Sequence, residues 1–413
     1  MTRRSPLVLL ALAYLGFVSL GLPDGLLGVA WPAMRARFAL PQGALGALLA
    51  TATAGYVAAS FAAGRLLRRM RIGGLLALSC LTTAASLLGY ASAPAWLVVV
   101  AWGVLAGLGA GAIDAGINAY VASQHSARTV NWLHACYGIG AAAGPALMSA
   151  VLARGLGWER GYAIVGGAQL ALAVGFAATY GRWPSRAEAA AADAPHAPTA
   201  ETLRATLRVP AARWGAAAFF VYTGIEAGVG AWSYSLLAMG RGFAMDVAAF
   251  WVSAFWVGLT AGRVLAGALA HRLRPGAILR LALGGLVAGT TLVWLAPVRG
   301  AELVGLAGVG LACGPIFPTL IATTPSRVGP GHAANAVGVQ IAAAALGQSG
   351  LPAALGFLAG AFGLETIGPF LALAALALAG IAAALRHAAA QPAARAPPSA
   401  RRTFARARWS RTR

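Results

Sequence analysis

The chain has 413 residues, of which 59% are hydrophobic and only 10% charged, too few polar groups to keep a soluble protein of this size dispersed. All 31 basic residues are arginine and the formal net charge is +21, but the arginines lie in short loops and near the C-terminal end, without interleaved aromatic residues. This pattern argues against a nucleic-acid-binding protein. We therefore expect a membrane protein surrounded by lipids.

Twelve apolar stretches follow one another along the chain, and each is long enough to cross a hydrocarbon core of ~30 Å. They lie at about 7–36, 43–63, 73–92, 95–121, 131–153, 161–180, 212–238, 246–270, 276–296, 301–323, 333–360 and 366–386. The sequence therefore predicts an all-α membrane protein with 12 transmembrane helices in two pseudo-symmetric six-helix bundles.

A segment without a sustained apolar face separates the two groups of six stretches. Residues 182–211 combine proline, alanine and charged residues, as a cytoplasmic surface linker does. We expect residues 1–181 to form the N-terminal bundle and residues 212–387 the C-terminal bundle. Residues 388–413 are rich in arginine and proline, so we expect a basic, disordered cytoplasmic tail, which either has no function or rests on anionic lipid.

The arginines are distributed unequally between the two sides of the predicted membrane domain. The side of the N-terminus carries Arg3, Arg4, Arg65, Arg68, Arg69, Arg71, Arg128, Arg182, Arg186, Arg204, Arg208, Arg213, Arg272, Arg274, Arg280 and Arg327, in addition to the tail. The other side carries only Arg35, Arg37, Arg154, Arg160, Arg241 and Arg299. Because arginine accumulates in cytoplasmic loops, we expect a bacterial-type inner (plasma) membrane protein with both termini in the cytoplasm.

Internal repeats support a duplication of one six-helix unit. The segment Gly64-Arg-Leu-Leu-Arg-Arg-Met-Arg71 after stretch 2 resembles Gly267-Ala-Leu-Ala-His-Arg-Leu-Arg274 after stretch 8, at an offset of 203 residues. Asp24 and Glu226 correspond at 202 residues, and Gly107-x-Gly109 and Gly308-x-Gly310 at 201. A parallel duplication of this kind places a central site between two similar bundles.

Three carboxylates lie near the midpoints of predicted membrane helices: Asp24, Asp114 and Glu226. A charge at this depth costs roughly 2.5–3.5 kcal/mol, so such a group usually faces a water-filled cavity and serves a solute or proton pathway. A carboxylic acid can be neutral when it is occluded and ionised when water enters. We therefore predict that these three acids couple transport to protons, with Asp114 as the first candidate for the proton carrier.

Polar and aromatic side chains share helical faces with the three acids. Asn118 lies one turn after Asp114 and offers an amide beside the carboxyl group. Phe17 and Trp31 stand seven residues on either side of Asp24, where rings beside an acid suit a sugar. The predicted substrate-binding residues are Asp24, Trp31, Asn118, Asn131, His134, Tyr222, Glu226 and Gln340.

Each of these assignments has a structural alternative. Asp114 and Asn118 could join helices 4 and 5 by hydrogen bonds, and aromatic residues at helical spacing are often packing residues. His134 could form a gate or anchor a loop. Glu226 could pair with Arg263, an arginine inside a predicted membrane span, which needs a counter-charge.

The helix 4 and helix 5 sequences resemble a known transporter family. The segments are Gly111-Ala-Ile-Asp-Ala-Gly-Ile-Asn-Ala-Tyr120, Asn131-Trp-Leu-His-Ala-Cys-Tyr-Gly-Ile-Gly140 and Gly144-Pro145. Together with the glycine and arginine loop after stretch 2, in which Arg68 replaces the usual aspartate, the chain resembles the major facilitator superfamily. Within it, the chain is similar to the fucose–galactose–glucose proton symporter branch and its sugar-transporter-like relatives.

The resemblance implies a proton-coupled symporter of a sugar or a similar small polar solute. The acids that couple protons in helices 1 and 4 of that branch fall on Asp24 and Asp114, and its helix 4 asparagine falls on Asn118. The segments Phe219 to Trp232 and Gly314-Pro-Ile-Phe-Pro318 also fit.

Two other functions remain open at this point. Gly140-x-x-x-Gly144-Pro145 resembles the helix 5 signature of antiporters, which favours proton-driven efflux of drugs or metabolites. A receptor or scaffold that kept the fold without transporting is the third possibility, since fold alone does not establish function.

Enzymatic and metal-binding signatures are missing from the sequence. It has no Gly-x-Ser-x-Gly elbow, no His-Glu-x-x-His and no Walker loop. Cys80, Cys136 and Cys313 lie inside apolar stretches at spacings that suit neither zinc nor a disulfide. We therefore expect no enzyme, no cofactor and no metal, and a monomeric protein.

Overall fold

A computed structural model describes residues 5–67, 69–124, 127–183, 201–269 and 271–395, and its secondary structure is entirely helical in these ranges. The first half contains α1 (Ser5–Arg37), η1 (Gln42–Ala44), α2 (Leu45–Leu66), α3 (Ile72–Ser92), α4 (Trp96–Gln124), α5 (Ala127–Ala153), α6 (Trp158–Ala178) and η2 (Tyr180–Arg182). The second contains α8 (Leu203–Arg208), α9 (Pro210–Ser235), η3 (Leu236–Gly240), α10 (Met245–Leu269), α11 (Pro275–Leu295), α12 (Ala301–Cys313), α13 (Ile316–Val328), α14 (Pro330–Phe362), η4 (Leu364–Thr366) and α15 (Ile367–Arg395).

The predicted all-helical membrane fold is confirmed. Within the described residues, eleven helical spans are long and apolar enough to cross a membrane. α9 occupies the place of a twelfth span, although its composition is more polar, with Arg213 and Glu226 inside the helix. The predicted span at 301–323 is in fact two helices, α12 and α13, separated by Gly314 and Pro315, because proline has no N–H to continue the helical ladder.

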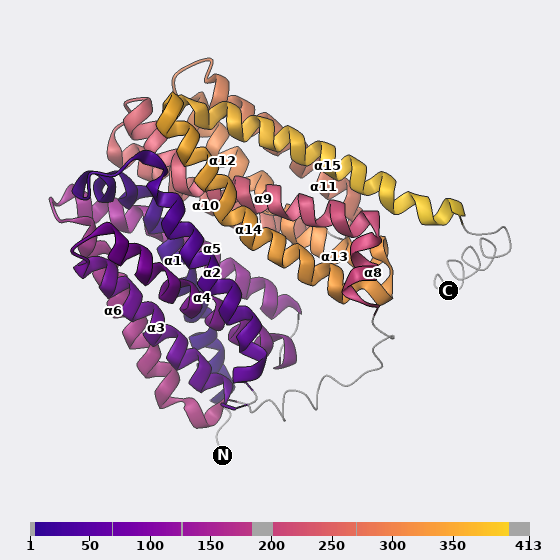
Figure 1. Ribbon diagram of the computed structural model, residues 1–413, viewed down its shortest axis with the longest axis horizontal. Helices are drawn as coiled ribbons and strands as arrows, with labels where there is room; N and C mark the ends of the chain where they lie inside the picture. Colours follow the sequence, from indigo (N-terminus) through magenta and orange to yellow (C-terminus); the bar gives the residue numbers. More distant parts are fainter. Residues whose placement is uncertain (1–4, 68, 125–126, 184–200, 270, 396–413) are drawn as a thin grey trace.

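The helices form two bundles that pack in corresponding ways (Figure 1). α1 packs on α5, α2 on α4 and α3 on α6; in the second half α9 packs on α14, α10 on α12 and α11 on α15. Between the bundles, α5 contacts α10, α2 contacts α14 and α1 contacts α9. The predicted pseudo-symmetry is therefore visible in the helix pairs themselves.

Glycine contacts define the register of the repeat more accurately than the sequence motif. A Cβ atom at Gly107 would overlap the carbonyl oxygen of Ala52 in α2, and one at Gly310 would overlap the carbonyl oxygen of Phe255 in α10. Gly107 and Gly310 are 203 residues apart in the sequence, and so are their contact partners Ala52 and Phe255. This offset agrees with that of the repeated arginine loops. The predicted pairing of Gly107 with Gly308, at 201 residues, is therefore wrong, since a Cβ atom at Gly308 would have no neighbouring atom within 4 Å.

The different surroundings of these two glycines lead to a prediction about stability. Gly107→Leu is expected to lower the free energy of unfolding by about 1–3 kcal/mol, because α2 and α4 must separate to accommodate the side chain. Gly308→Leu, with open space around its Cβ position in the partner bundle, is the control and is expected to have little effect. Thermal unfolding of the purified variants in detergent measures both, and equal destabilisation would contradict the assignment.

The linker and the tail are described only in part. Residues 184–200 of the predicted linker and residues 396–413 of the predicted tail lie outside the described residues. Residues 203–208 form the short helix α8, and α15 continues to Arg395, beyond the predicted start of the tail at residue 388. The alanine-rich sequence of 388–395 explains this extension, because alanine has the highest helix propensity.

Candidate functional site

The two bundles are in contact on one side of the molecule and apart on the other. We call the end where α1 begins and α15 ends the termini side; Figure 1 shows the bundles separating toward it. Toward the opposite side, a Cβ atom at Gly28 of α1 would overlap the carbonyl oxygen of Gly230 in α9. At the end of that side, a Cβ atom at Gly43 in η1 would lie 3.3 Å from Cα of Phe357 in α14. Only glycine permits backbones to approach this closely.

Asp24 lies at the inner end of the separation between the bundles. It is solvent-exposed, although it occupies the middle of α1 and its neighbours Gly25 and Leu26 are buried. The Tyr137 hydroxyl of α5 donates a hydrogen bond to its Oδ2, at 2.7 Å. One turn further along α1, the contact of Gly28 with α9 closes the path. From this exposure and the separation of the bundles in Figure 1, we infer that a cavity opens toward the termini side and ends near this carboxylate.

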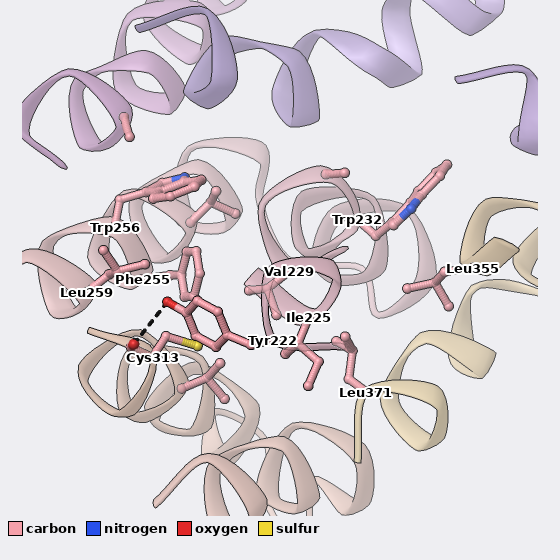
Figure 2. Close-up of a cluster of buried hydrophobic side chains, with 14 of the residues drawn as sticks. Tyr222, Ile225, Val229, Trp232, Phe255, Trp256, Leu259, Cys313, Leu355 and Leu371 are labelled. Atoms are coloured by element: carbon pink, nitrogen blue, oxygen red, sulfur yellow. Dashed lines mark hydrogen bonds between the residues drawn. The ribbon is translucent and has the colours of Figure 1, made fainter. Parts of the chain in front are cut away.

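Glu226 faces the same region from the second bundle. Its Oε2 accepts a hydrogen bond from the Tyr222 hydroxyl on the preceding turn of α9. That hydroxyl also lies within donating distance, 3.0 Å, of the carbonyl oxygen of Cys313, as the dashed line in Figure 2 marks. Cys313 ends α12, where carbonyl groups lack helical partners. A hydroxyl donates only one hydrogen, so Tyr222 can serve only one of these two acceptor oxygens at a time.

An arginine accompanies Glu226, as its position in the sequence suggested. Nη2 of Arg263 in α10 lies 3.9 Å from Oε1 of Glu226, and the two side chains are 21% and 16% exposed. The distance is at the upper limit for an ion pair. The Glu226 carboxylate also interacts electrostatically with Asp24 and Tyr137. Residues from α1, α5, α9 and α10 thus form one charged cluster across the bundle interface.

Asp114 is held differently from the other two acids. The Tyr56 hydroxyl of α2 donates to its Oδ2 at 2.6 Å, and the Asn118 amide donates to its Oδ1 at 2.9 Å. All three residues belong to the first bundle, and Tyr56 interacts electrostatically with Asp24 as well. The alternative that Asp114 and Asn118 join helices is therefore partly realised, but between α4 and α2 rather than between α4 and α5.

The remaining predicted site residues differ in how close they lie to this charged cluster. His134 packs edge-on against Phe17, with ring centroids 5.6 Å apart, and interacts electrostatically with Arg263. Trp31 is fully buried against Trp96. Gln340 is buried and accepts a hydrogen bond from Thr324. In this conformation Trp31 and Gln340 pack within the protein, and their role in binding stays a prediction. The side chain of Asn131 lies outside the described residues.

Several site residues were not predicted from the sequence. Tyr56 and Tyr137 donate to the two aspartates of the first bundle, and the main-chain carbonyl of Cys313 joins the Glu226 group. Tyrosines occur throughout the helices, so only their contacts distinguish these two. The Gly-Pro pair at 314–315 was the one available signal for a carbonyl freed from the helical ladder.

The long ion pair between Glu226 and Arg263 leads to a second prediction about stability. Glu226→Gln and Arg263→Gln are each expected to lower the free energy of unfolding by about 2 kcal/mol, since each leaves a partly buried charge without its partner. The double variant is expected to recover most of this loss. Arg241 and Glu365 form the matched control: their pair is 2.8 Å long but Glu365 is 59% exposed, so its double-mutant cycle should give a smaller coupling energy. Additive effects at Glu226 and Arg263 would refute the pairing.

The chain was compared with protein families and solved structures. The family model of the Major Facilitator Superfamily matches residues 13–352. A search of curated proteins found no match. Solved structures that share the fold include the nucleoside transporter NupG (15% identity, 93% of this chain and 99% of that chain, TM-score 0.68), the D-xylose-proton symporter (16%, 90% and 97%, 0.66) and the Major Facilitator Superfamily transporter FucP in the outward conformation (18%, 93% and 99%, 0.62). At these identities the likeness concerns the fold alone.

Proposed function

This chain belongs to the Major Facilitator Superfamily, and we propose that it is a proton-coupled symporter of a small polar solute of the sugar class. Members of the superfamily are secondary transporters, not enzymes, and this chain is a multi-pass membrane protein. The finer proposal concerns the solute, the coupling ion and the direction of transport. It rests on the arrangement of acids at the bundle interface.

The observation that carries the proposal is the exposed Asp24 carboxylate at the end of the cavity. It accepts a hydrogen bond from Tyr137 and interacts electrostatically with Glu226 of the other bundle. A carboxylate without a cationic partner is costly to seal from water. Closure of the termini side therefore requires that Asp24 first takes up a proton or binds hydroxyl groups of a solute. One group can thus serve both ligands.

The arginine distribution supports an orientation for this conformation. The termini side carries most of the arginines in the loops, so we assign it to the cytoplasm. The cavity at Asp24 is then open to the cytoplasm, and the contacts of Gly28 and Gly43 with the second bundle close the outer side. Alternation between this state and its opposite would carry solute across the membrane.

The sugar class is supported by chemistry as well as by resemblance. Carboxylates, the Asn118 amide and tyrosine rings offer the acceptors, donors and flat faces that a monosaccharide needs. FucP and the D-xylose-proton symporter share the fold, and the name of the second refers to a sugar and a proton. For this chain, that combination is a proposal.

Reconstitution in proteoliposomes tests the proposed function. D-glucose, D-galactose, L-fucose and D-xylose are offered outside, with and without an inward proton gradient. We expect the gradient to drive accumulation of at least one sugar, and Asp114→Asn to abolish coupling. Uptake that does not depend on the proton gradient, in the wild-type protein and in Asp114→Asn alike, refutes proton symport. Drug tolerance that rises on overexpression, without sugar uptake, would favour efflux, and no transport of any kind would favour a receptor.

A further inference from the structure

Several buried indole and hydroxyl groups have no hydrogen-bond partner within the described residues. They include the Nε1 atoms of Trp31, Trp158 and Trp256. Burying such a donor without an acceptor costs free energy, so each one raises the question of what it binds in another state. Trp158 lies inside the first bundle, where it packs against Tyr162 and Phe38. Trp256 differs because it lies at the interface between the bundles.

Trp256 is positioned beside the charged cluster. Its Cζ2 atom would lie 2.9 Å from a Cβ at Gly230, the glycine that α1 approaches at Gly28. Its ring meets the ring of Tyr137 at an angle of 80°, with centroids 6.5 Å apart. Tyr137 in turn donates to Asp24. In Figure 2 the indole lies at the edge of the cluster that faces the helices of the first bundle.

A second tryptophan shows that the unpaired donor is not a general property of this surface. Trp232 of α9 is also fully buried, and it also points toward the first bundle in Figure 2. Its Nε1 donates to the carbonyl oxygen of Pro352, at 2.9 Å. Trp232 therefore has a complete structural role, whereas the N–H group of Trp256 lacks an acceptor among the described residues.

We propose that Trp256 contacts the transported solute directly, with its indole N–H donating to a solute hydroxyl and its ring packing against the apolar face of a pyranose. The inference rests on the proposed function. Opening of the outer side must separate α1 from α9 at Gly28 and Gly230. The same movement uncovers Trp256 beside Tyr137 and Asp24. A hydroxyl group can accept from the indole and donate to the carboxylate, so a polyhydroxylated solute satisfies both at once.

Replacement of the indole by a ring without the donor tests this contact. The probe is the sugar of the four named above that shows the largest proton-driven uptake. Trp256→Phe is expected to raise its KM roughly five- to tenfold, the effect of losing one hydrogen bond, with little change in the maximal rate. Trp232→Phe is the matched control: it removes a satisfied bond, so it should lower thermal stability and leave KM unchanged.

Deoxy analogues of the same sugar identify the partner hydroxyl and need no further variant. Removal of one particular hydroxyl is expected to raise KM in the wild-type protein but not in Trp256→Phe, as a double-mutant cycle requires. If Trp256→Phe transports with unchanged KM, or if every deoxy analogue loses affinity equally in both proteins, the contact is refuted while the proposed function stands. If the wild-type protein transports none of the four sugars, the proposed function itself fails, and the solute contact with it.

Discussion

Gly28→Leu is expected to abolish transport by preventing closure of the outer side. Gly28 contacts the backbone of Gly230 where α1 and α9 meet, and a leucine side chain has no space there in the closed state. Overpacking of about 3 kcal/mol would shift the balance between the closed and open outer sides ~100-fold. The loss of transport is measured as uptake, in proteoliposomes, of the sugar that the wild-type protein accumulates best among the four named above. Thermal unfolding in detergent shows that the variant is folded.

The matched control for this variant is Gly284→Leu. Gly284 lies in α11 with no atom within 4 Å of a Cβ position, so the same change of residue should leave transport intact. Full transport by Gly28→Leu would show that this contact does not have to form during the cycle.

Asp24→Asn is expected to eliminate proton-driven accumulation while preserving the shape of the side chain. An asparagine cannot take up or release a proton, and its amide can still accept the hydrogen bond of Tyr137. Sugar exchange across the membrane without a gradient should survive at reduced affinity, because one acceptor for hydroxyl groups remains. The accumulation ratio under an inward proton gradient, together with the alkalinisation of the external medium on sugar addition, measures the coupling.

Asp246→Asn provides the comparison for this second variant. Asp246 is exposed at the start of α10, on the side opposite the termini, and its Oδ1 accepts from the backbone N–H of Val247. The identical chemical change there should leave accumulation unaltered. Proton-driven accumulation that persists in Asp24→Asn would assign the coupling to Asp114 or Glu226, each of which has its own partners in the structure.

The three acids inside the membrane helices show how much of the site the local sequence can predict. Their depth was predictable, because the cost of a charge in lipid depends on its position within an apolar stretch. The partners of each acid, however, could not be predicted from the sequence. Asp114 has two donors within the first bundle, whereas Asp24 is open to the cavity with one. Asp24 is therefore the most exposed of the three acids, whereas the sequence made Asp114 the first candidate for the proton carrier.

For the aromatic residues, helical spacing did not predict which rings lie near the acid. Phe17, Asp24 and Trp31 share a helical face, and this spacing indicated a ring beside an acid on either side. In the structure Trp31 is buried against Trp96, while Tyr137 of α5 donates to Asp24 and Trp256 of α10 packs against Tyr137. Helical spacing describes one helix only, and the partners of this face come from other helices, 65 residues away for Trp31 and Trp96 and 113 for Asp24 and Tyr137.

The sequence by itself determined the membrane helices, their duplication and the depth of the ionisable groups, because hydrophobic length and the cost of charge are properties of each segment alone. Tertiary structure decided the register of the repeat, the partners of each acid and the side on which the bundles are open. Those features depend on which glycines bring two backbones together, as at Gly28 and Gly230. Such contacts join residues about 200 positions apart, and no local pattern specifies them.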